Sequence, residues 1–191
     1  MIGGAVKNKE EREEQKIAVK PRGESQRNPF MEHFHRVKTA DRVYIASDHG
    51  GFRLKNSLVE RFKNKDHALV DLGPHSLDAG DDYPDYAEKV CAEILSKGGS
   101  GILICRSGHG MAITANKFKG IYASVCCSEE SAFKGKKDDN INVLCLAGDL
   151  VTEELAEKIV TTWLDTPYES IERRNRRFGK IREIEDRNFK S

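Results

Sequence analysis

From residue 42 onward, apolar positions alternate between two patterns. Short continuous apolar runs, typical of strands buried on both faces, give way to stretches in which apolar residues recur every three or four positions, as in amphipathic helices. Strands are predicted over 42–48, 68–73, 101–105, 122–126 and 143–147. A helical pattern follows each of them, and one more closes the chain from about residue 171. This alternation predicts an α/β fold with a parallel sheet between two helical layers.

The ends of several helices can also be predicted. Pro84 suits a first helical turn, and Gly98 with Gly99 ends the helix that this turn begins. A short helix from Ser128 to about residue 136 and another beginning at Thr152 open with hydroxyl residues that cap helices, followed by acidic residues. The apolar faces of the helices after strands two and five and of the last helix are predicted from Tyr86, Val90, Cys91, Ile94 and Leu95; Leu155, Ile159, Val160, Trp163 and Leu164; and Phe178, Ile181 and Ile184.

The first forty residues lack such a pattern. They are polar, they include a run of charged residues over 7–14, and they contain Pro21, Gly23 and Pro29. We expect residues 1–40 to form a flexible charged extension and residues 41–191 to form one domain.

Composition narrows the class of protein. Of 191 residues, 38% are hydrophobic and 33% are charged, and the net charge is only +1. No apolar run approaches the roughly 20 residues that a membrane helix needs. We therefore expect a cytoplasmic protein with neither nucleic acid nor membrane as its partner. The five cysteines lack C-x-x-C spacing, which favours neither a disulfide framework nor a zinc site.

Reactive residue types lie at the end of the predicted central strand. Cys105 ends the strand, Ser107 offers a hydroxyl, and Gly108 and Gly110 allow a tight turn before the next helix. Ligands of open parallel sheets bind at this edge, where helix N-termini offer N–H groups to anionic oxygens. A strand-end cysteine is nevertheless more often a small packed hydrophobe than a reactive group.

Two other strand ends should contribute to the same edge. Asp48 and His49 follow the first strand, and Tyr83 lies in the segment after the second. An Asp-His pair there is often only a helix cap. In the last predicted helix, Arg173 and Arg177 are four residues apart and share one side, which suits a phosphate clamp, although a solvated basic face is the simpler interpretation.

Several segments resemble the family of ribose-5-phosphate isomerase B and the galactose-6-phosphate isomerase subunits. The similar segments, in the family's order, are Ser47-Asp-His-Gly-Gly-Phe52, Asp82-Tyr-Pro-Asp-Tyr-Ala87, Gly101-Ile-Leu-Ile-Cys105, Ala115-Asn-Lys117, Asn142-Val-Leu144 and Arg173-Arg174-x-x-Arg177. The resemblance spans residues 42 to about 187. It implies a Rossmann-like three-layer sandwich with a five-stranded parallel sheet, a homodimer with active sites at the subunit interface, and interconversion of aldose and ketose phosphates without metal or cofactor.

The resemblance also implies roles for single residues. Cys105 matches the base that moves a proton between C1 and C2, most simply of ribose 5-phosphate and ribulose 5-phosphate. The substrate-binding positions it implies are Asp48, His49 and Tyr83 near the sugar, Ser107, Gly108 and Gly110 around the enediolate oxygens, and Arg173 and Arg177 at the phosphate.

Some positions depart from the family pattern. Arg106 and His109 replace a glycine and an apolar residue of the glycine loop, Asp138 replaces a histidine thought to open the sugar ring, and Asp149 replaces a substrate-binding arginine. If ring opening is still catalysed, another acid must serve, and His49 and His109 are the nearest histidines. The roles of Asp138, Asp139 and Asp149 stay open.

Three alternatives remain at this point. The same chemistry could act on another phosphosugar, such as allose or galactose 6-phosphate. The chain could bind a sugar phosphate without turnover, which the lost histidine and arginine favour. A generic nucleotide-binding module is less well supported, because no G-x-G-x-x-G turn follows the first strand.

Overall fold

The computed structural model describes residues 42–189, so the extension predicted at 1–40 lies outside the described residues. Five strands form one parallel sheet in the order β2-β1-β3-β5-β4. They are β1 (Val43–Ser47), β2 (Leu69–Asp71), β3 (Ser100–Cys105), β4 (Ala123–Val125) and β5 (Val143–Ala147). Each overlaps a predicted strand, and the predicted five-stranded α/β fold is confirmed.

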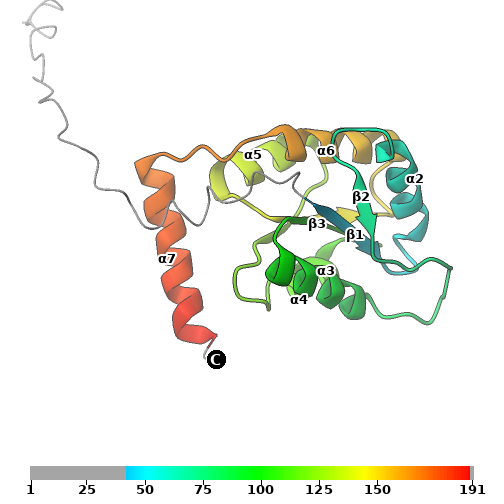
Figure 1. Cartoon of the computed structure of the whole chain (residues 1–191), viewed down its shortest axis with the longest axis horizontal. Coiled ribbons are helices and arrows are strands. Elements are labelled where there is room, and N and C mark those ends of the chain that lie inside the picture. Colours follow the sequence, from blue (N-terminus) through cyan, green and yellow to red (C-terminus); the bar gives the residue numbers. More distant parts are fainter. Residues whose placement is uncertain (1–41, 190–191) are drawn as a thin grey trace, which may run out of the picture. The chain divides into compact units, whose positions relative to one another are not determined.

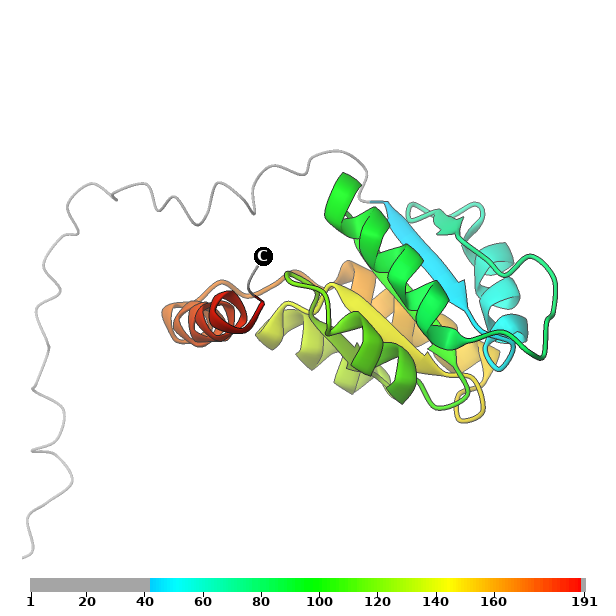
Figure 2. The ribbon, with the colours of Figure 1, turned by 90° about the horizontal axis from the view of Figure 1, so that it is seen from below.

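Six helices complete the described part of the chain: two cover one face of the sheet, three cover the other, and the last lies beside the sheet (Figure 1). They are α2 (Phe52–Phe62), α3 (Tyr83–Lys97), α4 (His109–Ala115), α5 (Glu129–Asp139), α6 (Glu153–Asp165) and α7 (Glu172–Asn188). Helices α2, α5 and α6 share one apolar cluster with the sheet, and α3 and α4 share the other. Figure 2 views the sheet from the side of α3 and α4, which lie in front of its strands and run along them.

Alternation along the central strands builds both clusters. Ile102 and Ile104 of β3 pack toward α2 and α6, whereas Leu103 and Cys105 pack toward α3 and α4. Each of these side chains is at most 5% exposed. A strand with both faces buried therefore carries a continuous apolar sequence, which is why the run from Ile102 was informative.

The predicted helix starts are confirmed by their capping contacts. Ser128 accepts a hydrogen bond from the backbone N–H of Ser131 at 3.1 Å, and Thr152 accepts one from Leu155 at 3.2 Å. Helix α5 runs three residues beyond its predicted end, to Asp139. It stops there because Asn140 adopts the left-handed conformation, with φ of 51°.

The predicted apolar faces were partly wrong. Leu95 is 51% exposed, although its neighbour Ile94 is buried, so the buried stripe of α3 is narrower than its apolar pattern. Helix α7 is held by Phe178, whose ring meets that of Tyr122 at 4.7 Å, and by Glu185, which accepts hydrogen bonds from Gly120 and Tyr122. Ile181 and Ile184 of the predicted apolar face are not buried by the other described residues: their exposed fractions are 45% and 50%. No helix within residues 42–189 is long and apolar enough to cross a membrane.

Candidate active site

The chain reverses its direction of winding between β1 and β3, which lie side by side at the middle of the sheet. Beyond their carboxyl ends, three loops are joined by backbone hydrogen bonds. Asp48 donates to Ile104 at 3.2 Å, Gly148 donates to Cys105 at 2.8 Å, and Asp149 donates to Arg106 at 3.0 Å. Open α/β sheets bind their ligands at such a point. The loops that carry the predicted catalytic and sugar-binding residues therefore converge here.

Cys105 ends β3 with its side chain turned toward α3 and α4 and only 5% of the residue exposed. Its sulfur accepts a hydrogen bond from the backbone N–H of Gly108 at 3.1 Å. Gly108 has φ of 76°, a left-handed conformation that favours glycine, and it precedes the first turn of α4. Ser107, between them, is exposed. This turn directs one N–H donor at a buried thiol.

Tyr83 lies against the same loop. It is the first residue of α3, and its ring covers the α-carbon of Gly110, where an added Cβ would lie 2.7 Å from the ring. The Tyr83 side chain is partly open to solvent, and the residue is 39% exposed. A glycine at position 110 is therefore what lets the phenol approach the loop that follows Cys105.

Asp48 combines a structural contact with a place in the site. It extends β1 by one residue, so alternation puts its side chain on the same side of the sheet as Cys105. One carboxylate oxygen, Oδ1, accepts the backbone N–H of Gly51 at 3.0 Å, which supports the start of α2. Asp48 is 5% exposed, and burial raises the pKa of its carboxyl group. The simpler interpretation as a helix cap is wrong in detail, because the N-cap of α2 is Gly51 and Asp48 binds the N–H of that residue.

His49 has a partner that the sequence did not predict. Oδ1 of Asp81 accepts both the backbone N–H of His49, at 2.9 Å, and its ring Nδ1, at 2.7 Å. The Asp81 side chain is 7% exposed and that of His49 is 29% exposed. The hydrogen bond with Asp81, aided by the charge of Asp48, raises the pKa of His49. Burial would raise the pKa of Asp81, but the hydrogen bonds from His49 outweigh it and lower that pKa.

Arg106 and Asp149 lie at the exposed side of the loops that follow β3 and β5. One guanidinium nitrogen of Arg106 is 3.4 Å from a carboxylate oxygen of Asp149, and both side chains are more than half exposed. The Arg106 stem packs over Gly50, where an added Cβ would lie 2.5 Å from its Cγ. An exposed pair of this kind contributes little to stability. The charge of Arg106 nevertheless acts on the nearby His49 and lowers the pKa of its ring.

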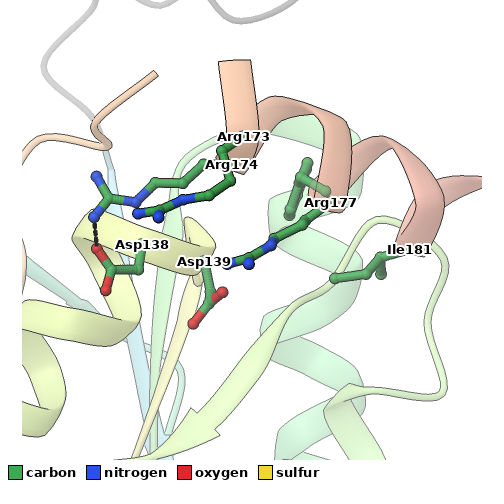
Figure 3. A pocket seen from close by; sticks show the side chains of 7 residues that line it. Asp138, Asp139, Arg173, Arg174, Arg177 and Ile181 are labelled. Carbon is green, nitrogen blue, oxygen red and sulfur yellow. Dashed lines mark ion pairs between the residues drawn. The ribbon is translucent and has the colours of Figure 1, made fainter. Parts of the chain in front are cut away.

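Arg173 and Arg177 lie elsewhere. They line a pocket of about 80 Å³ together with Asp138 and Asp139 at the end of α5 (Figure 3). Because α5 runs back from the carboxyl end of β4 to the amino end of β5, this pocket borders the opposite edge of the sheet from Cys105.

Arg174 also lines this pocket. It is only 13% exposed and forms ion pairs with both Asp138 and Glu169. The carboxylate of Asp138 is therefore committed to a guanidinium partner within its own chain.

Within one chain the predicted site residues thus form two groups. Those at the carboxyl edge of the sheet are Asp48, His49, Tyr83, Cys105, Ser107, Gly108 and Gly110. The arginines 173 and 177 form the other group, beside the end of α5.

Comparison with known proteins agrees with this architecture. The family model described as ribose/galactose isomerase matches residues 43–181. This chain belongs to that family. A protein of Mycoplasma genitalium named probable ribose-5-phosphate isomerase B is 43% identical over 141 residues, which are 73% of this chain and 92% of that protein.

Solved structures of the family superpose well. The ribose-5-phosphate isomerase B of Mycoplasma genitalium with bound ribulose 5-phosphate gives a TM-score of 0.72 at 42% identity, covering 75% of this chain and 95% of that one. The enzyme of Clostridium thermocellum gives 0.73 at 37% identity, covering 76% and 98%. The family and the isomerase class predicted from the sequence motifs are confirmed.

Proposed function

We propose that this protein interconverts ribose 5-phosphate and ribulose 5-phosphate by proton transfer through an enediolate, with Cys105 as the base. The observation that carries the proposal is the meeting of Cys105, its glycine loop and the Asp48-His49 pair at the point where the sheet reverses its winding. Relatives named for this activity support the choice of substrate.

The chemistry needs a base beside a carbonyl and donors for the oxygen that becomes negative. In the open aldose, the Cys105 thiolate takes the proton from C2, the C2–H pair forms the C1–C2 double bond, and the π pair of the C1 carbonyl moves to O1 to give the enediolate. The O2 hydroxyl proton then passes to O1, the O2 pair forms the C2 carbonyl, and the C1–C2 π pair takes the proton back from the thiol at C1. The N–H bond from Gly108 stabilises a thiolate more than a thiol. Backbone donors of the same loop, with the Ser107 hydroxyl, are suited to the enediolate oxygens. Asp48 and Tyr83 border this space and bind sugar hydroxyls.

A second copy of the chain completes the site. Arg173 and Arg177 cannot reach a phosphate at Cys105 of their own chain, because they border the opposite edge of the sheet. In a dimer with two-fold symmetry, the arginine pair of each copy can serve the carboxyl edge of the other, which gives two equivalent sites. Each arginine can bind phosphate oxygens through its planar fork of N–H groups. The cytoplasm remains the predicted location.

A second candidate keeps the chemistry and changes the sugar. Arg106 and Asp149 put a positive and a negative side chain beside the proposed site. Both are exposed, so they can contact a part of the substrate that is distant from Cys105. A hexose 6-phosphate has one more carbon there than a pentose 5-phosphate. Allose 6-phosphate and galactose 6-phosphate are therefore the alternative substrates.

A direct assay decides between these candidates. Purified protein would be supplied with ribose 5-phosphate, allose 6-phosphate and galactose 6-phosphate, and ketose formation would be followed for the protein and for Cys105→Ser. We expect the highest kcat/KM on ribose 5-phosphate and a loss in the variant. Binding of these sugars without turnover would instead support a non-catalytic sugar-phosphate-binding protein.

A further inference from the structure

The pair of His49 and Asp81 has the geometry of a fixed acid. One carboxylate oxygen of Asp81 accepts from both the backbone N–H and the ring Nδ1 of His49, so the backbone and the imidazole are held together. With Nδ1 donating its proton to Asp81, the other nitrogen, Nε2, is the one that faces a ligand. Of the residues between 42 and 189, none is hydrogen-bonded to Nε2. A proton there is available for transfer.

We propose that His49 is the general acid that opens the closed sugar ring, and that Asp81 is the residue that positions it. This inference rests on the proposed isomerase function, because only a cyclic aldose phosphate needs this step. Asp81 belongs to the loop between β2 and α3, whereas Asp48 and Cys105 lie at the ends of β1 and β3. Its contribution to the reaction passes through His49.

The step balances without any co-reactant other than water. The C1–O4 bond of the closed aldose breaks and its electron pair stays on O4. O4 takes the proton from Nε2 of His49, while the anomeric hydroxyl gives its proton to water and becomes the C1 carbonyl. His49 is left neutral and regains a proton from solvent. The open aldose is then the substrate for Cys105.

Charged groups around His49 favour the protonated ring on balance. Asp81 contacts it from the loop before α3, Asp48 precedes it at the end of β1, and Arg106 opposes its charge from the loop after β3. Tyr86 of α3 interacts with the Asp81 carboxylate and helps to lower its pKa. With two carboxylates against one guanidinium, the pKa of His49 is raised, which keeps more of the ring in the acid form at neutral pH.

The other candidate acids are placed less well. His109 is the first residue of α4, and within residues 42–189 its ring has no hydrogen-bonded carboxylate to position it. Asp138 forms an ion pair with Arg174 and lines the pocket at the opposite edge of the sheet from Cys105. His49 is the candidate whose partner supports a positive charge.

Measuring both directions of the reaction tests the acid. Ribulose 5-phosphate is open-chain, so its conversion does not need ring opening, whereas ribose 5-phosphate is mostly closed. In His49→Gln we expect consumption of ribose 5-phosphate to fall by about 10²–10⁴-fold and to stop rising with enzyme concentration, as spontaneous ring opening becomes limiting. Consumption of ribulose 5-phosphate should stay proportional to enzyme and fall less than about tenfold. Equal losses in both directions would overturn the role of His49.

Asp81→Asn tests the positioning role through the titration of His49. An acid catalyst loses activity as pH rises through its pKa, so removing the carboxylate should move that limb of the ribose 5-phosphate profile to lower pH. The NMR titration of the His49 ring should move in the same direction. Asp85→Asn, which removes an exposed carboxylate in the first turn of α3, is the matched control and should leave both unchanged. An unmoved His49 titration in Asp81→Asn would overturn the inference.

The isomerase function and the acid role of His49 can be refuted separately. No turnover of any phosphosugar by the unaltered protein would refute the isomerase function itself. Turnover in both directions with an insensitive His49→Gln would leave the isomerase function intact and remove only the acid. Thermal melting of each variant shows whether a loss of rate reflects a loss of fold.

Discussion

The backbone N–H of Gly108 lies 3.1 Å from the sulfur of Cys105 and is directed at it. This contact exists because Gly108 adopts a left-handed conformation, which turns the chain back toward the strand it has just left. An N–H donor so placed favours negative charge on the sulfur. The turn therefore supports the proposed base and begins the loop that is proposed to surround the substrate oxygens.

Replacing Cys105 by Ser should lower kcat by about 10²–10⁴-fold, because a serine hydroxyl at this site is a far weaker base than a thiolate. The change is nearly isosteric, so melting temperature should change little although the site is buried. Steady-state kinetics on ribose 5-phosphate provides the measurement. Cys145→Ser, in a buried position of β5, controls for the cost of burying a hydroxyl, and a comparable loss of kcat there would count against a special role for Cys105.

The shared site can be tested by mixing two inactive variants. Cys105→Ser lacks the base, and the double variant Arg173→Ala, Arg177→Ala lacks the phosphate ligands. If each site takes its base from one chain and its arginines from the other, a two-fold dimer of the two variants has one intact site of two. After unfolding and refolding together, the mixture should recover up to about a quarter of the unaltered activity. No recovery would mean that both groups act within the same chain.

Gly110→Ala should push the ring of Tyr83 away, since the new Cβ would lie 2.7 Å from it. We expect a raised KM and a loss of about 1 kcal/mol or more in the free energy of unfolding. In a Tyr83→Ala background the same change should cost little, which a double-mutant cycle from chemical denaturation would reveal.

Gly179→Ala in α7 is the matched control for this prediction, because no atom lies within 4 Å of the added Cβ. Alanine is preferred over glycine in a helix interior by about 1 kcal/mol, so this variant should be slightly stabilised. Purely additive effects of Gly110→Ala and Tyr83→Ala would contradict the packing described here.

Arg106→Ala should shift the pH profile in the opposite direction to Asp81→Asn. The guanidinium of Arg106 lowers the pKa of His49, so its removal should raise that pKa and keep the acid protonated to higher pH. The limb of the ribose 5-phosphate profile that falls with rising pH should then move upward. Arg53→Ala, which removes an exposed arginine from the first turn of α2, is the control. A shift downward, or none, would show that Arg106 does not act on His49.

The sheet could be predicted from sequence because its central strands are buried on both faces and bounded by glycine or polar turns. The placement of Asp48 and Cys105 at one edge of the sheet also followed, since parallel strands end at the same edge. Asp81 could not be singled out, because four acidic residues lie between 78 and 85 and only the path of the loop decides which one meets His49. The acidic residues of that loop were the sequence feature that could have suggested a carboxylate partner for His49.

The arginines of α7 illustrate a different limit. Their four-residue spacing predicted that Arg173 and Arg177 share one side of the helix, and both line the same pocket. Which edge of the sheet that pocket borders depends on where α7 docks, and this is set by Phe178 and Glu185 against the loop at 120–122. Periodicity within one helix carries no information about that contact.

The placement of Cys105 and of the Arg173–Arg177 pair at opposite edges of one sheet bears on how this enzyme behaves at low concentration. If a single copy holds only half of each site, an isolated copy can be fully folded and still inert. Specific activity should then fall when the protein is diluted below the concentration at which copies associate, although its circular dichroism stays the same. The concentration of protein in a cell would then determine both the number of chains and the fraction of those chains that are associated into complete sites.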